Sequence, residues 1–159
     1  MTPLYAKIIE AAATRYVLAP QLVTAVVAVE SDGNPWAIRY EPGFYDRYVQ
    51  AAPIKAKAPC SNDTERRLRA MSFGLMQIMG QTARERGFVG TYLSQLCDPE
   101  TGIEYGCKHL SWLASRYLDA YGWEGVIAAY NAGSPRRDGP RWGNQGYVDK
   151  IRAAGGFGS

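Results

Sequence analysis

The pattern of apolar and polar positions along the chain predicts helices nearly throughout. Apolar residues recur at intervals of three and four, and Pro3, Pro20, Pro42 and Pro99 stand where first helical turns would begin. Thr2 is expected to cap the first of these helices. The helices expected on this basis cover residues 2–16, 20–31, 42–50, 63–71, 73–79, 81–87, 98–121, 123–132 and 144–154.

Strand patterns are much weaker. No segment shows convincing alternation, and only a small hairpin within 32–41 is left open. Two segments indicate surface loops: residues 51–62 are rich in Ala, Pro and Lys, and residues 133–146 are rich in Gly, Pro and Arg. The fold class expected is therefore mostly α, with residues 1–159 forming a single domain, as suits a chain of this length.

Composition narrows the classes of partner. Hydrophobic residues make up 47% and charged residues 21%, as in ordinary globular proteins. The net charge of +3 is too weak to indicate a nucleic-acid partner. The longest apolar run, residues 22–29, falls far short of the roughly 20 residues of a membrane span, and charged residues interrupt the N-terminal segment where a signal peptide would be apolar. We expect a monomer without nucleic acid or membrane insertion.

Cysteine and histidine do not indicate a metal centre. Cys60, Cys97 and Cys107 permit at most one bridge, and both a Cys97–Cys107 disulfide and three buried thiols remain open. The single histidine, His109, is expected on the exposed side of its helix, and these residues lack the paired short spacing of zinc ligands. We therefore expect neither a metal nor a cofactor.

Glu30 is the most unusual residue of the chain. It ends a helix whose residues at three, four, seven and eight positions before it are all apolar, namely Val27, Val26, Val23 and Leu22. The other face of this helix is nearly as apolar, so we expect the helix to be buried all round. A carboxylate in such a place must be neutralised, paired or used in chemistry.

Two effects would raise the pKa of Glu30. Apolar surroundings disfavour the anion, and the C-terminal end of a helix carries the negative pole of its dipole. A pKa that starts at about 4.3 would approach about 6, which suits a general acid. The alternative is an ion pair at the edge of the core with an arginine such as Arg39.

Several further motifs carry polar residues that packing leaves unexplained. In Gly74-Leu75-Met76-Gln77 the amide of Gln77 offers a donor and an acceptor for sugar groups, and the glycine would allow a ligand to approach the backbone. Ala129-Tyr130-Asn131-Ala132-Gly133 also reads as a plain helix C-terminus, with Gly133 in the left-handed conformation.

Together these motifs resemble the lytic transglycosylases of the goose-lysozyme-like superfamily. The resemblance rests on Glu30-Ser31, on Asn34-Pro35-Trp36-Ala37, on the Gly-Leu-Met-Gln motif at 74–77, on Asp98-Pro99 at the start of the long helix, on the Ala-Tyr-Asn-Ala-Gly motif at 129–133 and on Tyr147-Val148. It covers nearly the whole chain in order. It implies a lysozyme-like helical fold and activity on peptidoglycan glycan strands in the periplasm or cell wall.

Residues 38–71 depart from the compact family pattern. They stand between the Asn-Pro-x-Ala and Gly-Leu-Met-Gln motifs, as in transglycosylases encoded by phages and prophages, which suggests an enzyme that is exported or carried in a virion. The insertion brings a second carboxylate, Glu41, near the groove that the resemblance implies.

The resemblance also implies roles for individual residues. Glu30 would act as the single acid and base in cleavage of the MurNAc–GlcNAc β-1,4 bond, with formation of 1,6-anhydroMurNAc. Ser31, Gln77, Met76 and Glu41 would contact or flank the sugar. Tyr130 would orient the carboxylate or bond the substrate, and Asn131 and Tyr147 would line the groove.

Two other functions remain open from the sequence. A goose-type lysozyme would cleave the same bond with water, which Glu41 or Asp46 would have to hold. A non-catalytic module of a virion or secretion apparatus would only bind glycan, although a binder has no use for a costly buried acid.

Overall fold

The computed structural model describes residues 3–158, and these form two compact units. One unit, here called the terminal unit, joins Met1–Val29 to Cys107–Ser159, and the other, the middle unit, is Glu30–Gly106. The boundaries fall within two helices, α2 (Pro20–Ser31) and α6 (Pro99–Ala132). The single domain predicted for residues 1–159 stays a prediction, and Thr2, the expected cap, lies outside the described residues.

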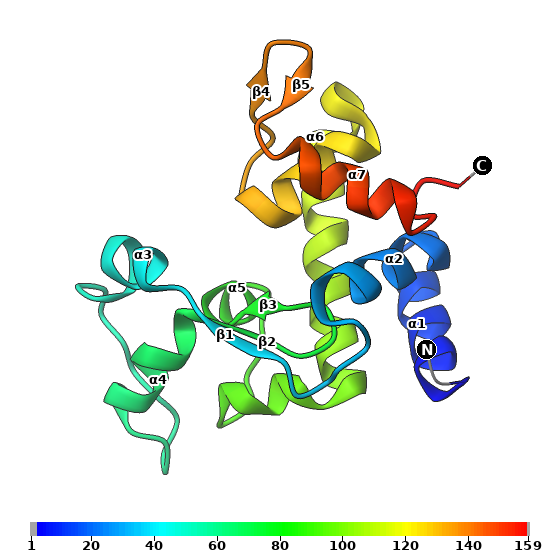
Figure 1. Cartoon of the computed structure of the whole chain (residues 1–159). Coiled ribbons are helices and arrows are strands. Elements are labelled where there is room, and N and C mark those ends of the chain that lie inside the picture. The colour runs from blue at the N-terminus through cyan, green and yellow to red at the C-terminus, as the bar shows by residue number, and fades with distance from the viewer. Residues whose placement is uncertain (1–2, 159) are drawn as a thin grey trace. The chain divides into compact units, whose positions relative to one another are not determined.

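The terminal unit is helical, as predicted. It holds α1 (Pro3–Arg15), most of α2 and α6, and α7 (Gln145–Ala153), together with a small hairpin of β4 (Arg137–Asp138) and β5 (Arg141–Trp142) (Figure 1). The predicted division of the long helix is confirmed, because Gly122 has φ 66° and ψ −177° and interrupts the helical backbone. The apolar faces of these helices form the core of the unit, with Ile9, Val26, Leu110 and Ile127 at most 1% exposed.

The middle unit contains a small sheet that the sequence pattern did not predict. Strands β1 (Ile38–Tyr40), β2 (Met71–Phe73) and β3 (Ile78–Met79) pair antiparallel in that order, with Ile38 opposite Phe73 and Phe73 opposite Ile78. The helix expected over 73–79 is therefore wrong. The apolar spacing there comes from the short strands β2 and β3, which are joined by a turn. The other partner of β2 is β1, which lies more than thirty residues earlier in the chain.

Short helices complete the middle unit. They are α3 (Pro42–Phe44), which continues as a π-helix over Tyr45–Val49, then α4 (Asn62–Arg69), α5 (Gly80–Glu85) and a 3-10 helix over Leu93–Cys97. The Ser61 hydroxyl accepts a hydrogen bond from Thr64 N at 3.1 Å, so Ser61 caps α4, which begins one residue before the predicted start at residue 63. The core of the unit gathers around Phe73, Phe88, Leu93 and Leu96.

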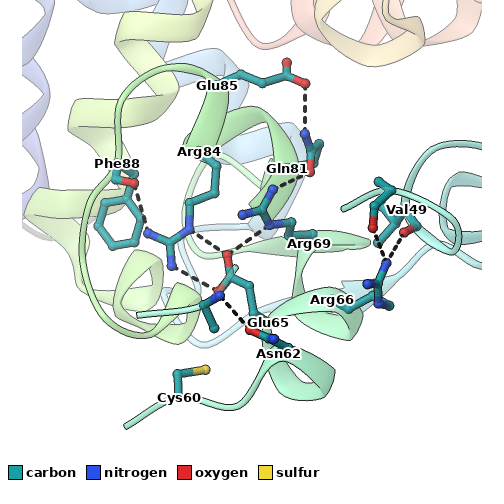
Figure 2. A network of polar contacts seen from close by, with 12 residues as sticks. Val49, Cys60, Asn62, Glu65, Arg66, Arg69, Gln81, Arg84, Glu85 and Phe88 are labelled. Carbon is teal, nitrogen blue, oxygen red and sulfur yellow. Dashed lines mark hydrogen bonds and ion pairs between the residues drawn. The ribbon is translucent and has the colours of Figure 1, made fainter. Parts of the chain in front are cut away.

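A buried ion cluster joins α4 to α5. The Glu65 side chain is 1% exposed, and its carboxylate accepts two hydrogen bonds from Arg84, at 2.8 and 3.0 Å, and one from Arg69 at 3.0 Å (Figure 2). Burial acts to raise the pKa of Glu65, but the hydrogen bonds and charges of Arg84 and Arg69 outweigh it, so the pKa lies below its ordinary value. Arg66 donates to the carbonyls of Val49, Gln50 and Ala52 and so anchors the preceding loop. The insertion is therefore a packed part of the unit.

The three cysteines are buried thiols that form no disulfide with one another, which answers the question left open for Cys97 and Cys107. Burial raises the pKa of the Cys97 thiol. In the part of the chain that the structure describes, no helix is both long and apolar enough to cross a membrane. The mostly helical fold class is confirmed.

Candidate active site

The end of helix α2 carries the glutamate singled out in the sequence. The expected apolar stripe is buried, with Leu22, Val23, Val26 and Val27 at most 2% exposed. Glu30 itself is half-buried. The expectation that the helix is buried all round is wrong, because Ala28 is exposed. A half-buried carboxylate at the end of a buried apolar stripe is packed on its helix and still reachable by a ligand.

Ser31 fixes this helix end to the turn between β2 and β3. Its hydroxyl donates a hydrogen bond to the carbonyl oxygen of Leu75 at 2.8 Å, across 44 residues of sequence. The turn at 74–77 has left-handed backbone at both ends, with φ 73° at Gly74 and 48° at Gln77. A residue other than glycine rarely adopts such a φ, so the contacts of Gln77 must hold it there.

The Gln77 amide supplies those contacts. Its Nε2 donates to the carbonyl oxygens of Ala37 at 2.8 Å and Gly74 at 3.0 Å, and its Oε1 accepts from the Ser72 hydroxyl at 2.9 Å. Both amide hydrogens are thereby used within the chain. The Ala37 carbonyl also accepts the Gly74 amide at 2.8 Å. The motif thus ties the segment that follows Glu30 to the hairpin turn.

Two expectations about this motif change. Met76 is fully buried, and a side chain added at Gly106 would collide with it, so packing explains Met76 and we leave it out of the sugar-contacting set. The glycine at 74 is required by the fold itself. A Cβ there would lie 2.6 Å from the backbone oxygen of Leu96, so the close approach that it allows is to the chain itself.

Glu41 stands at the start of α3, just after β1. Its Oε1 lies 3.0 Å from Nε of Arg39, and its side chain is 36% exposed. Arg39, the arginine considered as an alternative partner for Glu30, is thus paired with Glu41. A partly exposed carboxylate that is already in an ion pair has less reason to hold a catalytic water than a buried one without such a partner.

The remaining predicted residues lie in the terminal unit. Gly133 has φ 87° and its N–H reaches the Ala129 carbonyl at 2.7 Å, which confirms the left-handed helix end. The exposed Asn131 accepts a hydrogen bond at 2.9 Å from Asn144, which also donates to the Ala128 carbonyl at 3.0 Å. Asn144 is the residue just before α7, and no motif in the sequence marks it as a partner of Asn131.

Tyr130 has aromatic neighbours that the sequence did not indicate. Its ring centroid lies 5.7 Å from that of His109, which in turn stacks on Trp112 at 5.9 Å. His109 is half-buried, so its expected exposed position is wrong. Tyr130 and Tyr147 are also half-buried.

The predicted site residues therefore form two sets. Glu30, Ser31, Gln77, Met76 and Glu41 belong to the middle unit, and Tyr130, Asn131 and Tyr147 belong to the terminal unit. Among the residues from 3 to 158, no group of three or more His, Cys, Asp or Glu side chains is arranged to hold a metal ion. Within the middle unit, the arrangement offers a partly accessible carboxyl group on a helix end that is hydrogen-bonded to the turn at 74–77.

Comparison with known proteins agrees with the motifs. The family model of the transglycosylase SLT domain matches residues 7–151, which confirms the family resemblance and the lysozyme-like helical fold. The endolysin of Enterobacteria phage PRD1 is 38% identical over 60 residues, which cover 33% of this chain and 40% of that protein. The chain thus spans well under two thirds of the length of this relative.

Proposed function

Because the chain belongs to the transglycosylase SLT domain family, we propose that it is a peptidoglycan lytic transglycosylase. Its reaction is cleavage of the β-1,4 bond between MurNAc and GlcNAc, with formation of 1,6-anhydroMurNAc. The name of the phage relative supports a lytic role, and the cell wall is the proposed place of action.

Glu30 is the proposed acid and base of this reaction. As a carboxylic acid it gives its proton to the glycosidic oxygen, the bond from C1 of MurNAc to that oxygen breaks, and GlcNAc leaves with a free hydroxyl. The carboxylate then takes the proton of the C6 hydroxyl while that oxygen bonds to C1. The proton of Glu30 is restored and no water is consumed. One carboxylate suffices because the attacking hydroxyl belongs to the same sugar.

The observation that carries the proposal is the hydrogen bond from Ser31 to Leu75. It fixes the residue next to Glu30 to a turn whose own backbone is held by Gln77. A general acid must be kept within hydrogen-bond reach of one atom of the substrate, so a fastened helix end favours catalysis over simple packing. A carboxylate retained for packing alone would need no such fastening.

The other residues have supporting roles in this proposal. Gln77 acts as a positioning residue, because its amide hydrogens are donated to the chain. Ser31 positions Glu30 and lies next to the sugar. The family resemblance assigns Tyr130, Asn131 and Tyr147, all in the terminal unit, to the binding of the glycan strand.

Replacement of Glu30 with Gln tests the proposal. Purified peptidoglycan would be digested with wild type and with Glu30→Gln, and the released fragments would be weighed by mass spectrometry. We expect anhydro fragments, lighter by one water than hydrolysis products, from wild type, and at least about a hundredfold less product from the variant. Circular dichroism would show that the helical fold persists.

The same measurement separates the alternatives. Fragments carrying the added water would identify a goose-type lysozyme reaction. Glycan binding without any released fragment, in a folded wild type, would identify a non-catalytic module. Activity of Glu30→Gln near the wild-type level would remove Glu30 from the mechanism.

A further inference from the structure

Exposed apolar side chains gather on one segment of the middle unit. Among the described residues, eight large apolar side chains are exposed, and four of them lie between 36 and 48, namely Trp36, Ile38, Tyr40 and Tyr48. Trp36 is the most exposed of these four, at 76%. Single exposed apolar residues are ordinary, but a gathered set on one segment marks an interaction surface.

Strand β1 separates apolar from charged side chains. Ile38 and Tyr40 alternate with Arg39, so they point to the opposite face of the strand. Arg39 pairs with Glu41 at 3.0 Å, and Pro42 follows at once. Charges and proline are features that discourage a further strand from pairing with the edge of a sheet, and β1 is one of the two edge strands of its sheet. The surface therefore favours a partner that packs on its side chains.

This surface is held close to Glu30. The Asn34 amide donates to the Ser31 carbonyl at 3.0 Å, and the Ala37 amide donates to the Asn34 carbonyl at 3.3 Å. Because each such turn keeps its ends within about 7 Å, Ser31 and Ala37 lie at most about 14 Å apart. The Trp36 amide is bound to Asn34 Oδ1 at 3.0 Å, and the Ala37 carbonyl is held by Gln77. Trp36 is thus fixed at a short distance from the helix end.

We propose that Trp36, Ile38 and Tyr40 form a docking face for the sugar backbone of a glycan strand, next to Glu30. This inference rests on the proposed function and extends it to the binding of the strand beyond the cleaved bond. The rings of Trp36 and Tyr40 combine a flat apolar face with one polar atom, which matches a sugar ring with its apolar C–H face and its rim of hydroxyls. Since Glu41 balances the charge of Arg39, the strand offers no net charge for an acidic peptide stem.

Binding can be measured without cleavage in the Glu30→Gln background. The probe is a preparation of peptide-free glycan strands, released from peptidoglycan by an amidase, and the released stem peptides serve as the second probe. We expect Trp36→Ala and Trp36→Leu to weaken glycan binding by about tenfold, and Trp36→Phe to retain most of the affinity, because stacking needs a flat ring. Val89→Ala changes another exposed side chain of the same unit, 75% exposed, and should bind like the parent.

Several results would overturn the docking face. One is a Trp36→Leu variant that binds glycan strands as well as the parent does, and another is a Trp36→Phe variant that binds them as weakly as Trp36→Leu. A third is a Trp36 variant that still binds glycan strands like the parent but no longer binds the stem peptides. If light scattering finds a dimer that Trp36→Ala dissociates, the face is a contact between copies and the inference is wrong.

The two proposals fail in different ways. If wild type releases anhydro fragments while Trp36→Leu binds like its parent, the docking face fails and the function stands. If wild type releases no fragments but glycan binding depends on the ring of Trp36, the lytic function fails and the docking face stands as a glycan-binding surface.

Discussion

Replacement of Glu65 with Gln is expected to destabilise the protein strongly, although the residue has no part in the proposed chemistry. The substitution keeps the shape of the side chain and removes its charge. It leaves the guanidinium groups of Arg69 and Arg84, whose side chains are only 17% and 14% exposed, without their shared carboxylate. Breaking a buried ion pair from one side costs about 3–5 kcal/mol of unfolding free energy, because the remaining charge stays buried.

The effect is large enough to measure by thermal unfolding. For a chain of this size, each kcal/mol corresponds to about 2–4 °C in Tm, so Glu65→Gln should lower Tm by about 6–20 °C. Asp63→Asn is the matched control, because Asp63 pairs with Arg67 at the same i, i+4 spacing on the same helix, but at 74% and 62% exposure. Such a surface pair contributes little, and its loss should hardly move Tm.

The pH dependence follows from the lowered pKa of Glu65. A group whose pKa is lower in the folded than in the unfolded chain stabilises the fold fully above its unfolded pKa and loses that contribution as pH falls through the folded pKa. The gap in Tm between wild type and Glu65→Gln should therefore be constant above the ordinary carboxyl pKa of 4.5 and close at lower pH. A gap no larger than that of Asp63→Asn, or one that widens on acidification, would refute this reasoning.

Three further predictions concern single residues. Glu41→Gln should keep substantial activity on peptidoglycan, because Glu41 is engaged with Arg39, and inactivation as complete as in Glu30→Gln would indicate a mechanism with two carboxylates. Gly74→Ala should lower the unfolding free energy measured by chemical denaturation by at least about 2 kcal/mol, because its backbone is left-handed and the new Cβ would lie 2.6 Å from the Leu96 carbonyl oxygen. Gly43→Ala is the control and should be tolerated, because open space surrounds Gly43. Val17→Asn should raise Tm by about 2–4 °C, because Val17 has φ 57° and asparagine adopts this left-handed backbone more easily than valine. Val17 is 88% exposed, so the change costs little packing, and Val89→Asn at another exposed valine should give no such gain.

The helices could be predicted from the sequence because their signals are local. The apolar stripe of α2 and its proline start gave its bounds, and Gly122 marked the break within α6. The three-stranded sheet could not be predicted in this way. Its strands are two or three residues long, too short for alternation to appear, and β2 depends on hydrogen bonds with β1 across the whole insertion.

In the candidate site, too, the residues could be predicted from local patterns, but their contacts with distant residues could not. The identity of Glu30 and Ser31 followed from a stripe and a motif, but the partner of Ser31 is a backbone carbonyl 44 residues away, which no side-chain pattern reveals. The exposure of Trp36 could not be predicted from the sequence either. An aromatic residue in a motif predicts burial as readily as binding, and only its 76% exposure distinguishes the two.

Gln77 shows how a polar residue beside a catalytic candidate can serve the fold instead of the ligand. An amide in a glycine-containing turn favours a sugar contact as long as its hydrogens are unassigned, but here they go to the carbonyls of Ala37 and Gly74. Changes at Gln77 would therefore reach Glu30 through the turn and alter stability and turnover together. Trp36 is exposed and its hydrogen bond to Asn34 comes from its backbone, so under the proposed docking face we expect a change to its ring to alter binding and leave stability unchanged. Under the proposal, recognition of the strand is therefore better sought in the exposed rings of Trp36 and Tyr40 than in the amide of Gln77.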